Sequence, residues 1–213
     1  MVRRREFFSS WLASLLIVVF LAAGSWSSSA RADAFGDGAT EFIKVLTKDA
    51  ITMLTGKDIT KAERAKRFRA LMLKNFSLKG IAKFVLGRHW RKASEDQQKE
   101  YLKLFEDLMV VTYADRFEKY SGEKLLIKRT EVRNKKDAIV YTTMVKANDG
   151  AKPLKVDWRV RTKDGAYTII DVMVEGISMI MTQKSEFASF IKKNGGELSA
   201  LLTELKKRID KNS

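Results

Sequence analysis

Four strand-like segments lie between two groups of helical segments, and this order constrains the fold more than any other feature of the sequence. From Leu125 the period of the apolar residues changes from that of a helix to that of a strand, which predicts strands at residues 125–133, 138–147, 153–162 and 166–174. Short polar turns separate these segments and favour an antiparallel meander of four strands. Helices, a meander and then helices again predict an α+β domain.

The third strand-like segment alternates between apolar and polar residues. Its apolar residues are Leu154, Val156, Trp158 and Val160, and its polar residues are Lys155, Asp157, Arg159 and Arg161. Successive side chains of a strand point to opposite faces. We therefore expect a sheet with one apolar face and one face that is wet or paired.

Helical spacing and capping signals predict the helices that precede the sheet. A first helix is expected at about residues 40–51, a second one after the capping-box sequence that begins at Thr60, and a third one from Leu78 to Leu86, closed by Gly87.

A second capping-box sequence, at Ser94, predicts the start of the longest helix, which is expected to run to Tyr120. After Gly176 the helical period returns, and Asn194-Gly195-Gly196 divides it into two helices.

The first 34 residues have the anatomy of an export signal. Three arginines begin it, residues 12–23 are apolar except for Ser14, and two small-x-small sites end at Ala32 and Ala34. We expect residues 1–34 to be a cleaved signal peptide and residues 35–213 to be a single domain. An uncleaved anchor is the alternative, and Arg4-Arg5 also permits twin-arginine export, although the general secretory route is favoured.

The charge of the chain indicates the kind of surface that it meets. The formal charge is +15, and removal of residues 1–32, with four basic residues and one acidic residue, leaves +12. For an exported protein this balance favours anionic lipid headgroups over nucleic acid. A soluble surface with scattered lysines is the alternative.

The sequence offers little for catalysis. It has no cysteine, a single histidine and none of the familiar hydrolase, phosphate-loop or dinucleotide motifs. Asp157, Asp171 and Glu175 lie near the sheet, but we expect Asp157 to pair with a neighbouring arginine and Glu175 to cap the corner between strand and helix. His89 is expected to be a packing residue. We predict no enzyme activity, no metal site and no cofactor.

Two stretches, Phe84–Ser94 and Asp171–Ile180, resemble the MlaC family, also called the toluene-tolerance family. Shorter matching pieces are Tyr113-Ala114, Val156–Arg159 and Gln183–Phe187. The order and spacing of these pieces agree over about residues 80–210, whereas residues 35–79 agree only in helical character and length.

This resemblance implies a periplasmic phospholipid carrier that maintains the lipid asymmetry of the outer membrane. The implied partners are an outer-membrane lipoprotein complex and an inner-membrane ABC transporter complex with its MCE-type component. The implied fold holds the acyl chains in an apolar cavity between helices and a curved sheet, with the headgroup outside. A related branch, the HpnM proteins, implies a hopanoid or another hydrophobic compound as cargo, and a small hydrolase is the remaining alternative.

Alternation and helical spacing select the residues expected to line the cavity. These are Phe84, Leu86, Leu104, Leu108, Val111, Val156, Trp158, Val160, Val172, Val174, Ile177 and Met181. The methionines between residues 173 and 181 suit a cavity wall, with ordinary core packing as the alternative. The candidates for the lipid headgroup are Arg88, Arg91, Arg159 and Arg161, and the alternative is that they solvate the outer faces.

Overall fold

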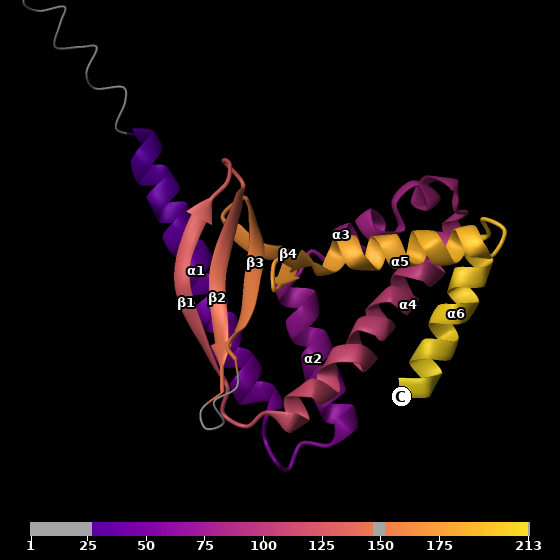
Figure 1. The fold of residues 1–213 in the computed structure, drawn as a ribbon, viewed down its shortest axis with the longest axis horizontal. Helices are drawn as coiled ribbons and strands as arrows, with labels where there is room; N and C mark the ends of the chain where they lie inside the picture. Colours follow the sequence, from indigo (N-terminus) through magenta and orange to yellow (C-terminus); the bar gives the residue numbers. More distant parts are fainter. Residues whose placement is uncertain (1–26, 147–151, 213) are drawn as a thin grey trace, which may run out of the picture.

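An antiparallel sheet forms one end of the molecule (Figure 1). Its strands follow the order of the chain: β1 (Lys124–Val132), β2 (Asp137–Val145), β3 (Leu154–Lys163), β4 (Ala166–Val174) and β5 (Ile177–Ser178). The predicted meander is confirmed. The computed structural model describes residues 27–146 and 152–212, with side chains from Ala34 onward, so most of the predicted signal peptide lies outside the described residues.

The expectation of four strands is wrong, because the described sheet has five. Glu175 and Gly176 have φ angles of 50° and 79°, which turn the chain back so that Ile177 and Ser178 pair with Val174 and Met173. Left-handed values at two consecutive residues are those of a tight hairpin turn. Because the helical period returns directly after Gly176, this two-residue strand has no pattern of its own in the sequence.

The register puts the apolar residues on one side of the sheet, as the alternation predicts. Val140 lies opposite Trp158, which lies opposite Val172. In the next row, Ala138 lies opposite Val160. We call this side the inner face.

Helix α1 (Ser27–Leu54) packs on the inner face over β1 and β2, as Figure 1 shows. It extends further toward the N-terminus than the predicted segment. It is also the longest described helix, so the prediction that the helix after Ser94 is the longest is wrong. Two glycines, which lower helix propensity, obscured its start. A Cβ at Gly38 would overlap the Tyr167 hydroxyl group, so this glycine lets α1 approach the sheet closely.

The other helices extend from the sheet toward the opposite end of the molecule, with α2 (Lys61–Asn75) nearest the sheet (Figure 1). The remaining ones are α3 (Leu78–Leu86), the 3₁₀ helix η1 (Gly87–Lys92), α4 (Glu95–Tyr113), the 3₁₀ helix η2 (Ala114–Lys119), α5 (Met179–Lys193) and α6 (Leu198–Asn212). The predicted α-helix up to Tyr120 is therefore an α-helix that ends at Tyr113 and continues as a 3₁₀ helix. Within the described ranges no helix is long and apolar enough to cross a membrane.

The first prediction concerns the start of α4. Ser94 Oγ accepts the Gln97 N–H at 3.2 Å and Gln97 Oε1 accepts the Ser94 N–H at 3.1 Å, so the predicted capping box is complete. Ser94→Ala should lower the free energy of unfolding by about 1 kcal/mol in urea titrations. Ser185→Ala, an exposed change within α5, is the control and should change it by less than about 0.5 kcal/mol. Equal effects would contradict a capping role.

Candidate functional site

The apolar interior consists of three clusters that lie along the molecule. The sheet cluster, between α1 and the inner face, comprises Ala39, Ile43, Leu46, Ala138, Val140, Val160 and Ile169. The helical cluster, among α3 to α6, comprises Ala82, Val85, Leu86, Tyr101, Leu104, Phe105, Leu108, Phe187, Ile191, Leu198, Leu201, Leu202 and Leu205. The linking cluster comprises Met72, Val110 and Ala114.

Partly buried side chains make these clusters continuous. Phe76 packs against both the sheet cluster and the linking cluster, and Leu78 and Met109 pack against both the linking cluster and the helical cluster. Trp158 and Val172 are partly buried on the inner face beside the sheet cluster. We call Phe76, Leu78, Met109, Trp158 and Val172 the apolar seam. An apolar path therefore runs from the sheet to the helices, and its seam still exposes apolar surface.

Polar groups on the inner face are satisfied internally. Trp158 Nε1 donates a hydrogen bond to Thr142 Oγ1 at 3.2 Å, and the Thr142 hydroxyl donates to the Val156 carbonyl oxygen. Thr142 is only 2% exposed. Because these groups have partners, the face remains apolar toward anything that packs on it.

A hydroxyl group in the helical cluster is satisfied in the same way. Tyr101 is fully buried against Phe105 and Phe187, and its hydroxyl donates to the Ala82 carbonyl oxygen at 2.9 Å. Burial raises the pKa of Tyr101 far above its usual value, so the ring stays neutral. The hydrogen bond ties α4 to α3 without introducing a charge.

The structure divides the predicted lining residues among several places. Leu86, Leu104 and Leu108 lie in the helical cluster, Val160 lies in the sheet cluster, and Trp158 and Val172 lie in the seam. Val156 is buried, and Val111 and Val174 are half-buried. Phe84, Ile177 and Met181 are 43%, 60% and 50% exposed. A role for these residues in lipid binding stays a prediction.

Sequence reasoning missed the residues that connect the two ends. Val110 and Ala114 lie four residues apart at the end of α4 and the start of η2, on a different side of the helix from Leu104 and Leu108, so the stripe that predicts the lining does not include them. Phe76 follows α2 directly. Its position beside the sheet depends on pairing with Ile169 of β4, which no local pattern indicates.

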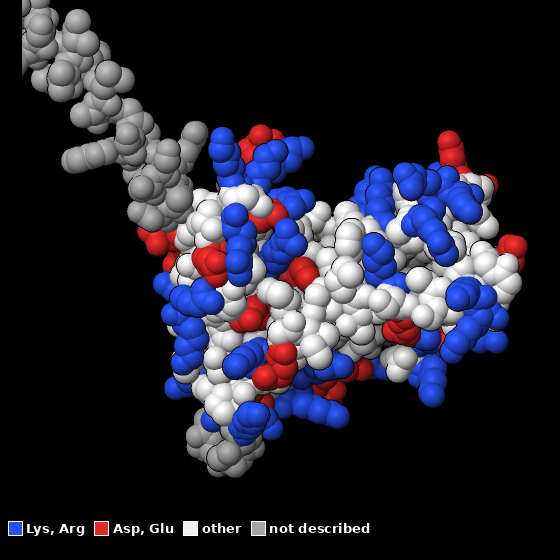
Figure 2. Space-filling view, turned by 45° about the horizontal axis from the view of Figure 1, so that its top comes forward, with Lys and Arg blue, Asp and Glu red and all other residues white. Residues whose placement is uncertain are grey.

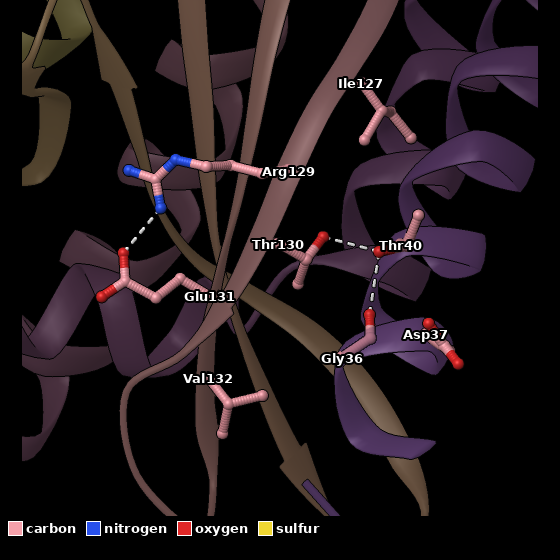
Figure 3. Close-up of a pocket in the computed structure, with 8 residues that line it drawn as sticks. All are labelled: Gly36, Asp37, Thr40, Ile127, Arg129, Thr130, Glu131 and Val132. Carbon is pink, nitrogen blue, oxygen red and sulfur yellow. Dashed lines mark hydrogen bonds and ion pairs between the residues drawn. The ribbon is translucent and has the colours of Figure 1, made fainter. Parts of the chain in front are cut away.

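Two grooves in the described structure are lined by residues other than the predicted ones. The larger groove, about 670 Å³, lies between α1 and β1 (Figure 3) and is lined by Gly36, Asp37, Thr40, Ile127, Arg129, Thr130, Glu131 and Val132. Thr40 and Thr130 hydroxyl oxygens lie 2.6 Å apart there, and Arg129 pairs with Glu131. The smaller groove, about 390 Å³, lies on the outer face of the sheet. Both are open and partly polar, unlike a chamber for acyl chains.

The headgroup candidates fall on two separate surfaces. Arg159 and Arg161 lie on the outer face and both bind Asp137, with nitrogen–oxygen distances of 2.9 and 2.6 Å. Asp137 is 2% exposed, and its hydrogen bonds with Arg161 and Arg159 lower its pKa to about 2. Arg88 and Arg91 are exposed on η1. Arg159 and Arg161 therefore already bind the Asp137 carboxylate.

The three carboxylates considered for catalysis all accept structural hydrogen bonds. Asp157 accepts the Thr142 N–H at 3.2 Å, so its expected pairing with a neighbouring arginine is wrong. Glu175 accepts the Lys155 N–H at 2.8 Å. Asp171 accepts from the Ser178 hydroxyl at 2.6 Å and from the Ile180 N–H at 3.4 Å at the start of α5, so Asp171, not Glu175, holds that corner.

The site contains no arrangement suited to a metal ion. Among the residues with described positions, no group of three or more His, Asp or Glu side chains is placed to bind one. His89 is half-buried, and burial together with Arg88 and Lys92 lowers its pKa. A neutral imidazole agrees with the expected packing role.

A solved structure shares this architecture. It is the phospholipid-binding protein from Ralstonia solanacearum, solved in complex with a phospholipid, which superposes with a TM-score of 0.71 at 20% identity over 80% of this chain and 96% of that chain. The match covers nearly the whole of that protein. The two chains therefore share the same α+β fold.

Sequence comparisons then give the family. The intermembrane phospholipid transport system binding protein MlaC of Haemophilus influenzae is 25% identical over 124 residues, which is 57% of this chain and 56% of that protein, so the match spans about half of the relative. The profile of the MlaC protein family matches residues 44–207, from within α1 to within α6. The chain belongs to the MlaC family, as the resemblance predicts.

The Asp137 cluster gives a prediction about pH. The folded pKa of about 2 lies below the usual 3.8, so the carboxylate stabilises the fold above about pH 4 and loses this contribution as the pH falls toward 2. Asp137→Asn should cost about 2 kcal/mol at pH 7, and the difference from the parent should shrink between pH 4 and pH 2 in urea titrations.

Asp164→Asn is the matched control for this prediction. Asp164 lies exposed in the turn between β3 and β4 with a φ of 52°, which asparagine tolerates well. Its stability should follow that of the parent at every pH. If Asp137→Asn followed the parent in the same way, the two arginines would not depend on this carboxylate.

Proposed function

We propose that this protein is a phospholipid carrier that holds acyl chains in an apolar cavity between the inner face of its sheet and helices α2 to α4. The observation that carries the proposal is the apolar seam: Phe76 and Met109 are only partly buried where they connect the clusters, and Trp158 and Val172 are only partly buried beside the sheet cluster. Family membership and the phospholipid-bound relative support phospholipid as the cargo.

The energetics favour such a carrier. Each buried methylene is worth about 0.8 kcal/mol, so two sixteen-carbon tails avoid water by roughly 25 kcal/mol as an upper estimate. Free diffusion of such a lipid through water is negligible. A protein removes this barrier to transfer when it covers the acyl chains. In the proposed cavity Trp158, Val172 and Val174 would cover the acyl chains, and Phe84, Ile177 and Met181 would form the rim.

We assign the headgroup to Arg88 and Arg91 in preference to Arg159 and Arg161. The latter two already share Asp137, whereas the described structure shows no acidic partner for the former two. A phosphate gains most from guanidinium groups that lack another anion. The remaining proposed lining residues would also contact the acyl chains: Leu86, Leu104, Leu108, Val111, Val156 and Val160.

The location and partners follow from the same proposal. Residues 1–34 would be a signal peptide cleaved after export through the general secretory route, leaving the domain of residues 35–213 in the periplasm. The Haemophilus relative is named as an intermembrane transport protein, which supports this compartment. The partners would be an outer-membrane lipoprotein complex and an inner-membrane ABC transporter complex with its MCE-type component.

We propose no catalytic activity. Asp157, Asp171 and Glu175 each hold a backbone or hydroxyl group that fixes the sheet or α5. A carboxylate committed to such a bond is less available as a general acid or base.

Cargo identity is tested by native mass spectrometry of protein purified without detergent from cells that express the full chain. We expect a diacyl phospholipid at close to one molecule per protein, because the seam needs an apolar partner. A hopanoid in its place would assign the chain to the related branch. Protein that carries no lipid and takes none from vesicles would contradict the carrier proposal.

The lining is tested by placing a charge in the seam. Val172→Asp should reduce lipid occupancy at least fivefold in native mass spectra, because a carboxylate beside the acyl chains is poorly solvated. Ile139→Asp is the control, since Ile139 is half-buried on the outer face of the same sheet, opposite Arg159. Samples are compared at equal folded fraction by circular dichroism. Equal occupancy in both variants would remove Val172 from the lining.

A further inference from the structure

Cationic side chains gather at the end of the molecule where α3, η1 and α5 meet (Figure 2). Between Ser77 and Ser94 the chain has five Lys or Arg residues and no Asp or Glu. Lys184 of α5 joins them, since its Cε lies 3.4 Å from where a Cβ at Gly87 would be. We call this set the basic surface: Lys79, Lys83, Arg88, Arg91, Lys92 and Lys184.

The charge of this surface is not neutralised within the described part of the protein, where none of its six members forms an ion pair. Other cations do find partners: Arg69 binds Glu106 and Asp107, and Arg208 binds Glu186 and Glu204. The lowered pKa of His89, caused by burial and then by Arg88 and Lys92, agrees with a positive local potential. Even with the proposed cargo phosphate at Arg88 and Arg91, Lys79, Lys83, Lys92 and Lys184 therefore offer their charge to an external anion.

Apolar side chains accompany the charges. Lys184 Nζ lies 4.2 Å from the ring centroid of Phe84, which is 43% exposed, and Lys83 Nζ lies 4.9 Å from the ring centroid of Trp90. Ile177 and Met181, just before and within the first turn of α5, are 60% and 50% exposed. Cations beside exposed aromatic and aliphatic groups are typical of surfaces that lie at the interface of a membrane.

We propose that the basic surface docks the protein onto an anionic lipid bilayer. A bilayer fits this combination because flexible Lys and Arg side chains reach phosphates at variable positions while Phe84, Ile177 and Met181 enter the headgroup region. Charge complementarity favours an acidic membrane over a neutral one. This docking does not depend on which lipid the protein carries.

The test is flotation with vesicles of phosphatidylcholine that contain about one third phosphatidylglycerol. The variant carries Lys79→Gln, Lys83→Gln, Lys92→Gln and Lys184→Gln, and the control carries Lys124→Gln, Lys128→Gln, Lys155→Gln and Lys163→Gln in the sheet. Both lose the same net charge from side chains that form no described ion pair. All proteins are purified in the same processed form, with the N-terminus verified by mass spectrometry.

We expect the first variant to partition onto the acidic vesicles at least tenfold more weakly than the parent, and the control less than threefold more weakly. Raising the salt from about 0.1 M to about 1 M shortens the Debye length from about 10 Å to about 3 Å and should release the parent protein. Pure phosphatidylcholine vesicles should bind it only weakly.

Three outcomes would overturn the proposal. Equal losses in the two variants would show that net charge, not this surface, governs binding, and equal binding to neutral vesicles would exclude charge recognition. Parent protein that binds no acidic vesicle would leave an acidic protein as the partner of this surface. Bound lipid is measured in the same samples, so a parent that carries lipid but fails to dock overturns only the docking proposal.

Discussion

The two edges of β4 determine how helices α2, α3 and α5 attach to the sheet. One edge pairs along its length with β3. The other edge is shared: Met173 and Val174 pair with the short strand β5, while the Ile169 carbonyl oxygen accepts the Ser77 N–H at 2.9 Å and Ile169 forms a bridge with Phe76. A longer β5 would occupy the position that Phe76 and Ser77 need. The shortness of β5 is therefore what allows α2 and α3 to dock.

Buried polar groups fix how the helices meet the sheet and one another. Asp171 binds the Ser178 hydroxyl and the Ile180 N–H, which orients α5 as it leaves the sheet. Buried Arg64 donates to the Leu54 and Ile59 carbonyl oxygens and so ties the end of α1 to α2. Among the described residues, every buried side-chain nitrogen and oxygen has a hydrogen-bond partner. Since an unpaired buried polar group costs about 1–3 kcal/mol, these bonds favour one arrangement of the elements over others.

Local patterns predicted most of the fold because they report on local physics. Alternation identified β1 to β4, and the Ser94 capping box and Gly87 marked helix ends that the structure confirms. The pairing of Asp137 with Arg159 and Arg161 was not predictable, since it depends on the register of β2 against β3. Likewise, periodicity separated inside from outside but did not separate the buried clusters from the partly buried seam, because the burial of Phe76 and Met109 depends on how the clusters pack against one another.

Helix α3 joins the two proposed activities of the protein. Ala82, Val85 and Leu86 pack into the helical cluster and Leu78 belongs to the seam, while Lys79 and Lys83 lie on the basic surface. A carrier must approach a membrane quickly and leave it again, and electrostatic attraction accelerates approach while remaining weak enough to reverse. An anionic bilayer bound to the outer side of α3 would lie against the same nine-residue helix that contributes Leu78 to the seam. The amphipathic character of α3 thus places membrane contact and cargo contact on one short element, so that docking can bias the packing of the seam.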